Sequence, residues 1–538
     1  MSMSTKERVE AIEREIDEAF AASPLLDEGY TQAVWTILSV NEATYLNQLR
    51  RDISDEEMGI YVDTYFNALT HPLRTAFKRA KRSSTALRNE LIERDVALAR
   101  KWLDAGVQYD QFSSLFPLWH RKRIEVEPSE NRLIVKSSYN SDRRYEAYNR
   151  FLTKEGRKQA APRGPSDDLL ELIESRVSFE QDTFRVKFNR KLVAALIAYV
   201  DPVIRSRHTL PADWEFLSFT LRDFRQVFTV IQAMCAGWHL AHSMAVNSGM
   251  IKNGYQSAVW VTGKSELVKR ITRFTSVKDA VVARIVSLLT FGSNAIRNPD
   301  IATQPLIDLE KGRYALGPFI WLNTSLERNL CTLLNQLPAE RSRYSTLTKS
   351  KENAAFDEAK RFLVGLGLVA KCGPVKGTDL DLGIVDHANR VCLCVEIKWF
   401  IEPAEVREIE NHAEELEIGI GQAKILQRLF AQRDKQFLET RLGITPNYRF
   451  FCVVGSVNWI GMGDTQDPDV PIVKLWHLLH HIERTSLGGA VDWLQSRRYL
   501  PEEGRDFTVH SLDIACGAWK ANWYGLLPAE GSAFLSEL

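Results

Sequence analysis

The stretch TDLDLGIVDHANRVCLCVEIKWF, residues 378–400, contains two runs in which apolar and polar side chains alternate. Alternation with period two is typical of β-strands, because successive side chains of a strand point to opposite faces of its sheet. The residues between the runs, Asp386 to Asn389, are of types that favour a turn. The pattern therefore predicts an antiparallel hairpin with strands over 378–386 and 390–400.

The same alternation assigns side chains to the two faces of the predicted hairpin. One face is apolar and holds Leu380, Leu382, Ile384, Val391, Leu393, Val395 and Ile397. The other face holds the charged residues Asp379, Asp381, Glu396 and Lys398, together with Cys392 and Cys394. We therefore expect three carboxylates and one ammonium group to meet on one face of a sheet.

Such a cluster is costly to bury for structural reasons alone, because each unpaired carboxylate loses its hydration. A divalent cation offsets this cost, and we expect Mg²⁺ or Mn²⁺ bound by Asp381, Glu396 and Asp379, since hard cations prefer carboxylate oxygens. Such an ion polarises a phosphate and lowers the pKa of a bound water. Lys398 can orient that water and share the negative charge that grows on the phosphate. The residues thus predict a metal-dependent hydrolase of phosphodiester bonds.

The order of Asp381, a hairpin and then Glu396-Ile397-Lys398 resembles the signature of the PD-(D/E)XK, or restriction-endonuclease-like, nuclease superfamily. The resemblance covers residues 350 to 460, about a fifth of the chain. It implies a central mixed sheet of four to five strands flanked by helices. It also implies that the first acid and the glutamate hold the metal, and that the lysine acts on the nucleophile.

Members of that superfamily often carry two further site residues on the flanking helices. An acid on the helix before the first strand matches Asp357 or Glu358, of which we favour Glu358, and a glutamine on the following helix matches Gln422, with Lys424 beside it. Gln422 and Glu358 therefore join the three catalytic candidates. The chain departs from the family pattern in two places: no proline precedes Asp381, and the acidic stretch EPAEVREIENHAEELE lies before the glutamine.

Composition places only broad limits on the protein. A chain of 538 residues is too long for one compact core, and its 69 lysines and arginines balance 69 aspartates and glutamates, so any nucleic-acid-binding surface must be local. The seven cysteines form no CxxC pair, which favours a reducing compartment. No uninterrupted apolar stretch reaches the length of about 18 residues that a spanning helix needs. We expect a cytoplasmic protein without membrane segments.

Helical periodicity dominates the chain before residue 345 and is interrupted by two predicted β elements. Proline, glycine and charge at 156–168 are typical of an exposed linker. The fold class that we expect is a largely α-helical N-terminal two thirds followed by an α/β domain of the PD-(D/E)XK type. The predicted segments are a mostly helical domain with a β-hairpin (1–155), the linker, a mostly helical domain with a short β element (169–345), the nuclease domain (346–490) and a C-terminal extension packed on it (491–538).

Positive charge is most concentrated at residues 74–101, where nine lysines and arginines face three acids. A solvated helix face is the ordinary interpretation of such a run. The alternative is a surface that binds phosphate groups of a nucleic acid. The candidate contacts are Lys78, Arg79, Lys81 and Arg82, with Lys424 as a further contact near the predicted catalytic centre.

Other clusters have simpler interpretations. Cys392 and Cys394 are expected to be small buried thiols rather than ligands of a soft metal. The histidines of WHLLHH (476–481) and the Cys-His-His set within 235–242 are expected to pack between helices, because neither has the glutamate of a HExxH zinc motif. The Gly-Ile-Gly sequence at 419–421 is interpreted as a turn before a helix.

The working hypothesis is an endonuclease that uses Mg²⁺ to cleave nucleic acid, with DNA favoured over RNA, and whose helical domains serve recognition or regulation. Large proteins of this layout resemble bacterial restriction or anti-phage defence effectors. Two alternatives stay open: a nuclease of DNA repair or recombination, and a catalytically inactive scaffold or nucleic-acid sensor. A homodimer, or a partner protein held through the helical domains, is compatible with each of them.

Overall fold

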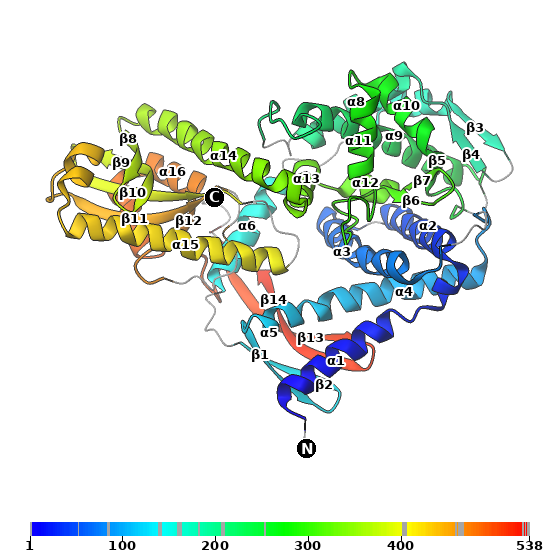
Figure 1. Cartoon of the computed structure of the whole chain (residues 1–538), viewed down its shortest axis with the longest axis horizontal. Helices are drawn as coiled ribbons and strands as arrows, with labels where there is room; N and C mark the ends of the chain where they lie inside the picture. Colours follow the sequence, from blue (N-terminus) through cyan, green and yellow to red (C-terminus); the bar gives the residue numbers. More distant parts are fainter. Residues whose placement is uncertain are drawn as a thin grey trace.

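The computed structural model of the chain places an α/β domain beside a larger helical body (Figure 1). It describes all residues except 1–2, 52, 83–86, 138–142, 159–163, 181–182, 206–209, 252–253, 401–405, 458–459, 461–466, 530–531, 533 and 535–538. Among the described residues, no helix has both the length and the apolar character needed to cross a membrane.

The α/β domain is built on a five-stranded mixed sheet with the strand order β12-β11-β10-β9-β8. The predicted hairpin is present, because β9 and β10 pair antiparallel, and β8 pairs antiparallel with β9. The strands β11 and β12 then add in parallel beside β10. The strands are β8 (Val369–Val375), β9 (Thr378–Asp386), β10 (Val391–Lys398), β11 (Arg449–Ser456) and β12 (Ile472–Lys474).

Both faces of this sheet are covered, so β10 is buried along Val391–Ile397 rather than exposed on one side. The helix α15 (Val406–Ala431) packs against β9, β10 and β11, on the face that carries Glu396. The helix α16 (Leu475–Arg484) packs against β12, and α17 (Leu487–Gln495) packs against β10. A π-helix, η2 (Gln436–Leu442), contacts β8. Glu396 therefore lies in an interior layer, with Asp381 and Lys398 partly buried beside it.

The helix α14 (Pro338–Gly365) joins the helical body to the sheet as one continuous element of 28 residues (Figure 1). The polar run at 341–353 forms the first half of this helix. The boundary expected at residue 345/346 falls inside it. Its signal was weak because a helix that spans the space between two domains is polar on most sides and lacks a clear apolar stripe.

One hydrophobic core of the helical body crosses a predicted domain boundary. It joins α2, α3 and α4 with Ile307, Ala315 and Phe319, which lie on β6, β7 and α12. The two helical domains expected at 1–155 and 169–345 therefore pack as partners around shared apolar residues. The helices of the helical body are α1 (Thr5–Phe20), η1 (Pro24–Glu28), α2 (Tyr30–Leu49), α3 (Asp55–Arg79), α4 (Glu93–Ser113), α5 (Leu115–His120), α7 (Asp167–Glu174), α8 (Arg190–Arg205), α9 (Leu221–Asn247), α10 (Lys264–Phe274), α11 (Asp279–Leu288), α12 (Pro318–Asn323) and α13 (Leu326–Gln336).

Short β elements lie within this body: the sequence analysis expected one between residues 169 and 345, and the described residues form two. The strands β3 (Val177–Glu180) and β4 (Thr183–Val186) form a ribbon, and β5 (Trp260–Gly263), β6 (Ile307–Asp308) and β7 (Arg313–Leu316) form a three-stranded sheet in the order β5-β7-β6. The predicted N-terminal hairpin is β1 (Ile124–Ser129) with β2 (Arg132–Ser137).

Two segments lie elsewhere than the sequence analysis expected. The helix α6 (Arg144–Lys158), assigned to the first helical domain, contributes Tyr145, Tyr148 and Phe151 to the core of the α/β domain. The C-terminal segment packs on the core of that domain through Phe507 and Leu526, as expected, but its strands β13 (Phe507–Cys516) and β14 (Trp519–Pro528) also leave that domain, because β14 pairs in parallel with β2. The result is a four-stranded sheet, β1-β2-β14-β13, made from segments that lie far apart in the sequence (Figure 1). The linker expected at 156–168 includes residues 159–163, which lie outside the described residues.

Candidate functional site

The hairpin register brings Asp381 and Glu396 together. The last residue pair of the β9–β10 ladder is Leu382 with Val395, so the next residues along each strand, Asp381 and Glu396, are neighbours where the strands separate. There the Asp381 carboxylate accepts a hydrogen bond of 2.8 Å from the backbone N–H of Ile397. The side chain replaces the lost ladder contact and fixes the carboxylate beside Glu396. The sequence analysis predicted this shared face correctly.

Glu396 is buried, and one of its two carboxylate oxygens has no hydrogen-bond partner. Only 1% of the residue is exposed; its Oε1 accepts a hydrogen bond of 3.0 Å from Lys398 Nζ, and its Oε2 has no hydrogen-bond partner. Burial, followed by the charge of Asp381, raises the pKa of Glu396 to about 8. Burial also raises the pKa of Asp381. The charge of Asp381 thus disfavours the charged form of Glu396, and a cation between the two groups would relieve this conflict.

Lys398 connects β10 to α15. Its Nζ donates to Glu396 Oε1 and, at 2.9 Å, to Gln422 Oε1. The amide of Gln422 in turn donates to Thr378 Oγ1 at 3.4 Å. The predicted glutamine is therefore in contact with the predicted lysine, although 24 residues separate them in sequence. We call Asp381, Glu396, Lys398 and Gln422 the candidate site.

The sequence analysis missed two residues that shape this site. Thr378 begins β9 and accepts the hydrogen bond from Gln422, but nothing in its local sequence distinguishes it from other strand-end threonines. Gly419 lies inside α15, so the interpretation of 419–421 as a turn before a helix is wrong. An isolated glycine within a helical pattern was the available signal, since such a residue costs helix stability and often marks a close approach.

The expected cluster of three carboxylates is not formed. No group of three or more His, Cys, Asp or Glu side chains suited to a metal occurs within the part of the chain that the structure describes. Asp379 is exposed and pairs with Pro374 of β8, beyond the end of the β9–β10 ladder, and only its charge acts on Asp381. The carboxylates of Asp381 and Glu396, with one unpartnered oxygen, are the donors that fit a hard divalent ion.

The acid expected on the preceding helix does not join these residues. Glu358 and Asp357 are exposed on α14, whose buried side is formed by Ala359 and Leu363. Among the described residues, no hydrogen bond or ion pair connects Glu358 with the candidate site. Its catalytic role stays a prediction from the family resemblance.

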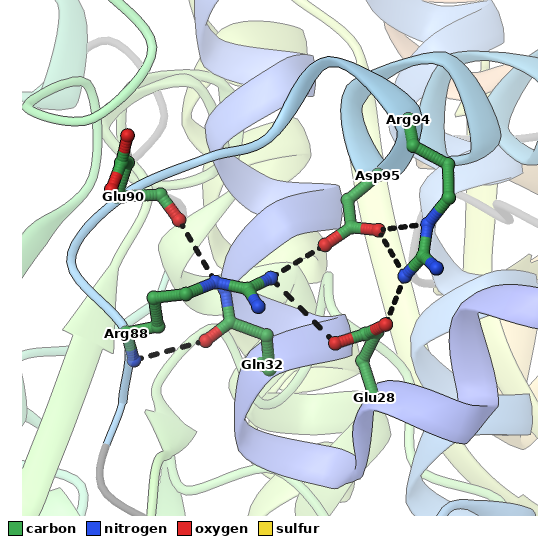
Figure 2. Close-up of polar contacts among 6 residues, drawn as sticks. All are labelled: Glu28, Gln32, Arg88, Glu90, Arg94 and Asp95. Carbon is green, nitrogen blue, oxygen red and sulfur yellow. Dashed lines mark hydrogen bonds and ion pairs between the residues drawn. The ribbon is translucent and has the colours of Figure 1, made fainter.

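Most positive charge at 74–101 is engaged within the chain. Figure 2 shows Arg88 and Arg94 converging on the Asp95 carboxylate, whose side chain is fully buried, and both also contact Glu28. The backbone N–H of Arg88 also donates to Gln32 Oε1 at 3.1 Å. These guanidinium groups therefore hold the start of α4 against α2 and η1. Their contacts favour a structural role over contact with phosphate groups.

The four proposed phosphate contacts of this run divide into two kinds. Lys78 Nζ donates to Asn298 Oδ1 at 2.6 Å, and the Arg82 guanidinium lies 3.6 Å from the centre of the Tyr30 ring. Arg79 and Lys81 are exposed, and residues 83–86 lie outside the described residues. Lys424 forms an ion pair with Asp467, which raises the pKa of the lysine. A phosphate-binding surface would thus depend most on Arg79 and Lys81.

The remaining clusters have the simple roles expected of them. Cys392 and Cys394 are fully buried, and all seven cysteines are free thiols. His477 accepts or donates a 2.7 Å hydrogen bond with the Tyr148 hydroxyl, and His242 bonds the backbone carbonyl of Gly254 at 2.7 Å. His477 and His242 therefore pack in the interior, whereas His480 is exposed.

The comparisons with known proteins leave the interpretation to this geometry. Neither a protein-family model, nor a curated protein, nor a solved structure matches the chain.

Proposed function

We propose that the α/β domain is a divalent-metal-dependent nuclease that hydrolyses phosphodiester bonds, with DNA as the favoured substrate. The observation that supports this most strongly is the buried Glu396 Oε2 atom, which has no hydrogen-bond partner beside a second carboxylate. Proteins rarely leave a buried polar atom unpaired, and such an atom calls for a functional explanation. A Mg²⁺ or Mn²⁺ ion held by Glu396 and Asp381 supplies that explanation.

The chain's own residues suit the remaining needs of hydrolysis. The bound ion would supply Lewis acidity toward a phosphate and toward an attacking water. Lys398 presents an ammonium group next to the carboxylates, held by two acceptors, and so provides positive charge where negative charge grows on the phosphate. Gln422 keeps this ammonium on the site face, because its oxygen accepts from Nζ while its amide donates to Thr378.

The test is a cleavage assay on the full chain. Purified protein is mixed with plasmid, branched duplex, single-stranded DNA or RNA, in the presence of Mg²⁺, Mn²⁺ or EDTA. We expect cleavage that requires the metal and falls by at least about a hundredfold in Lys398→Ala and Glu396→Gln, since each removes a group that stabilises developing charge. Lys520→Ala is the matched control, because Lys520 is exposed on β14, outside the catalytic domain's sheet.

The outcomes separate the alternatives. Preferential cleavage of the branched substrate would favour a repair or recombination nuclease. Binding without cleavage by any protein would favour the inactive scaffold or sensor, and equal cleavage by wild type and Lys398→Ala would exclude the proposed site. The helical body would then serve recognition or regulation, as in the restriction and anti-phage effectors that the layout resembles; this part rests on analogy of architecture alone.

A further inference from the structure

Gly419 lies at the closest approach between α15 and the charged end of β10. It is buried, and it sits three residues, or about one helical turn, before Gln422. Residues three apart on a helix face the same side. Gly419 and Gln422 therefore both face Lys398, one beside the aliphatic part of its side chain and the other at its amine.

A side chain at this position would displace the end of Lys398. A Cβ atom on Gly419 would lie 2.8 Å from Lys398 Cε, and 3.5 Å from both Glu396 Cγ and Val454 Cγ1. Carbon atoms in contact sit about 3.5 to 4.0 Å apart, so only the contact with Lys398 is too short. The missing side chain thus forms a slot that the lysine occupies.

We propose that Gly419 is a positioning residue, whose lack of a side chain lets Lys398 lie along α15 and reach Glu396 and Gln422 at once. A glycine within a helix is destabilising by about 1 kcal/mol relative to alanine. That loss has a physical reason here, because alanine would displace the one cationic group of the candidate site. The catalytic consequence rests on the proposed function, whereas the position of the amine does not.

The same helix supplies a matched control. Gly421 is also inside α15, but it is exposed, and a Cβ atom there would meet nothing within 4 Å. Gly419→Ala and Gly421→Ala therefore gain the same helix propensity, and only Gly419→Ala makes a contact that is too short, with Lys398 Cε.

The first experiment measures the amine directly. Full-length proteins are treated briefly with a limiting amine-acylating reagent, and labelling of Lys398 is quantified by mass spectrometry, with exposed lysines as internal standards. We expect labelling in Gly419→Ala to rise severalfold over wild type, and Gly421→Ala to match wild type. Equal labelling of Lys398 in wild type and Gly419→Ala would overturn the proposal. Where wild type cleaves nucleic acid, kcat of Gly419→Ala should fall at least tenfold with little change in KM.

The second experiment is a double-mutant cycle on stability, which works even if Gly419→Ala is less stable or if no substrate is cleaved. The unfolding midpoint is measured for Gly419→Ala in the wild-type and Lys398→Ala backgrounds. We expect the midpoint to drop in the wild-type background and not in the Lys398→Ala background, where the clashing atom is gone. An equal drop of the midpoint in both backgrounds would mean that the new methyl group is opposed by Glu396 or Val454 rather than by Lys398, and would overturn the proposal. Changed labelling without nuclease activity would keep the positioning role and reject the proposed function.

Discussion

The Glu396 carboxyl group is held where its charged form is disfavoured, and this makes metal binding depend on pH. Its folded-state pKa is about 8, above the ordinary value of 4.5, so the apoprotein retains a proton there at neutral pH. A metal must displace that proton. We therefore predict that apparent affinity for Mn²⁺ rises by up to about tenfold per pH unit below about pH 8 and then levels off. Isothermal titration calorimetry between pH 6 and 9 measures this dependence.

The same shift predicts the stability of the apoprotein. A carboxyl group with a raised folded-state pKa contributes stability that is complete below pH 4.5 and is lost as the pH rises through about 8. Glu396→Gln should therefore unfold at higher denaturant than wild type at pH 9 without metal, and should lose the pH dependence of Mn²⁺ binding. An affinity for Mn²⁺ that stays constant from pH 6 to 9 in wild type would show that the carboxyl group is already ionised.

Lys351 is a second buried charge, placed between the helical body and the sheet. Its Nζ has no hydrogen-bond partner and lies 2.8 Å from the centre of the Trp399 ring and 4.8 Å from that of Trp214. Burial lowers its pKa to about 7, while Cys331 and Glu327 act in the opposite direction. Because the folded-state pKa is depressed, charging this lysine destabilises the fold below pH 7, and the penalty disappears as the pH rises toward 10.5.

We therefore predict that Lys351→Met stabilises the protein most at low pH. The gain should be on the order of 2 kcal/mol at pH 6, since part of the desolvation cost is offset by the attraction of the two tryptophan faces. Urea unfolding of both proteins at pH 6, 7.5 and 9 gives the difference, which should shrink as the pH rises. A difference that is constant with pH would mean that Lys351 does not change its charge on folding.

At the scale of elements, the sequence pattern predicted correctly those features that depend on neighbouring residues of one hairpin. The β9–β10 hairpin followed from period two, and its register brought Asp381 beside Glu396 as expected. The glutamine on α15 could be placed only through the family resemblance, because the contact of Gln422 with Lys398 spans the fold. The exposed place of Asp379 depends on where the ladder ends, which the alternation of side chains does not encode.

The helix α6 shows most clearly what a local pattern leaves out. Its amphipathic sequence predicts a helix, but its apolar side is complementary to a domain more than 200 residues away, where Tyr148 contacts His477 and Lys474. The pKa of His477 is lowered to about 3 by burial, so its ring is neutral and Nδ1 can accept from the Tyr148 hydroxyl. This helix is thus a structural part of the domain that carries the candidate site.

We predict a graded loss of stability at this position. Tyr148→Phe removes the hydroxyl and leaves a buried ring nitrogen unpaired, which should lower the free energy of unfolding by about 1 to 3 kcal/mol. Tyr148→Ala also leaves a cavity and should lower it by about 3 to 5 kcal/mol. Urea unfolding followed by tryptophan fluorescence compares them, with Tyr255→Phe as a control in the helical body. Equal effects of the two Tyr148 substitutions would show that the ring itself is not packed in the core.

At the scale of the whole molecule, the candidate site depends on chain segments from both ends. Trp399 directly follows Lys398, the last residue of β10, and packs against a core of the helical body, so the strand that carries the site ends at the larger unit. The β1–β2 and β13–β14 hairpins share one sheet, and α6 completes the core under the strands of the candidate site. The α/β domain is therefore not contained in one continuous stretch of sequence.

This organisation predicts that a fragment of residues 346–538 cannot fold by itself. It lacks β2, which pairs with β14, and the aromatic residues Tyr145, Tyr148 and Phe151 of α6. Each buried aromatic side chain that is removed costs about 3 to 5 kcal/mol, and together they approach the whole stability of a typical domain, about 5 to 15 kcal/mol. The fragment should bind a hydrophobic dye and lack near-ultraviolet circular dichroism. When residues 122–158 are supplied as a separate peptide, dye binding should fall and the near-ultraviolet signal should appear. Cooperative unfolding of the fragment alone, at the midpoint of the full chain, would instead show that the α/β domain folds independently and that α6 does not contribute to its stability.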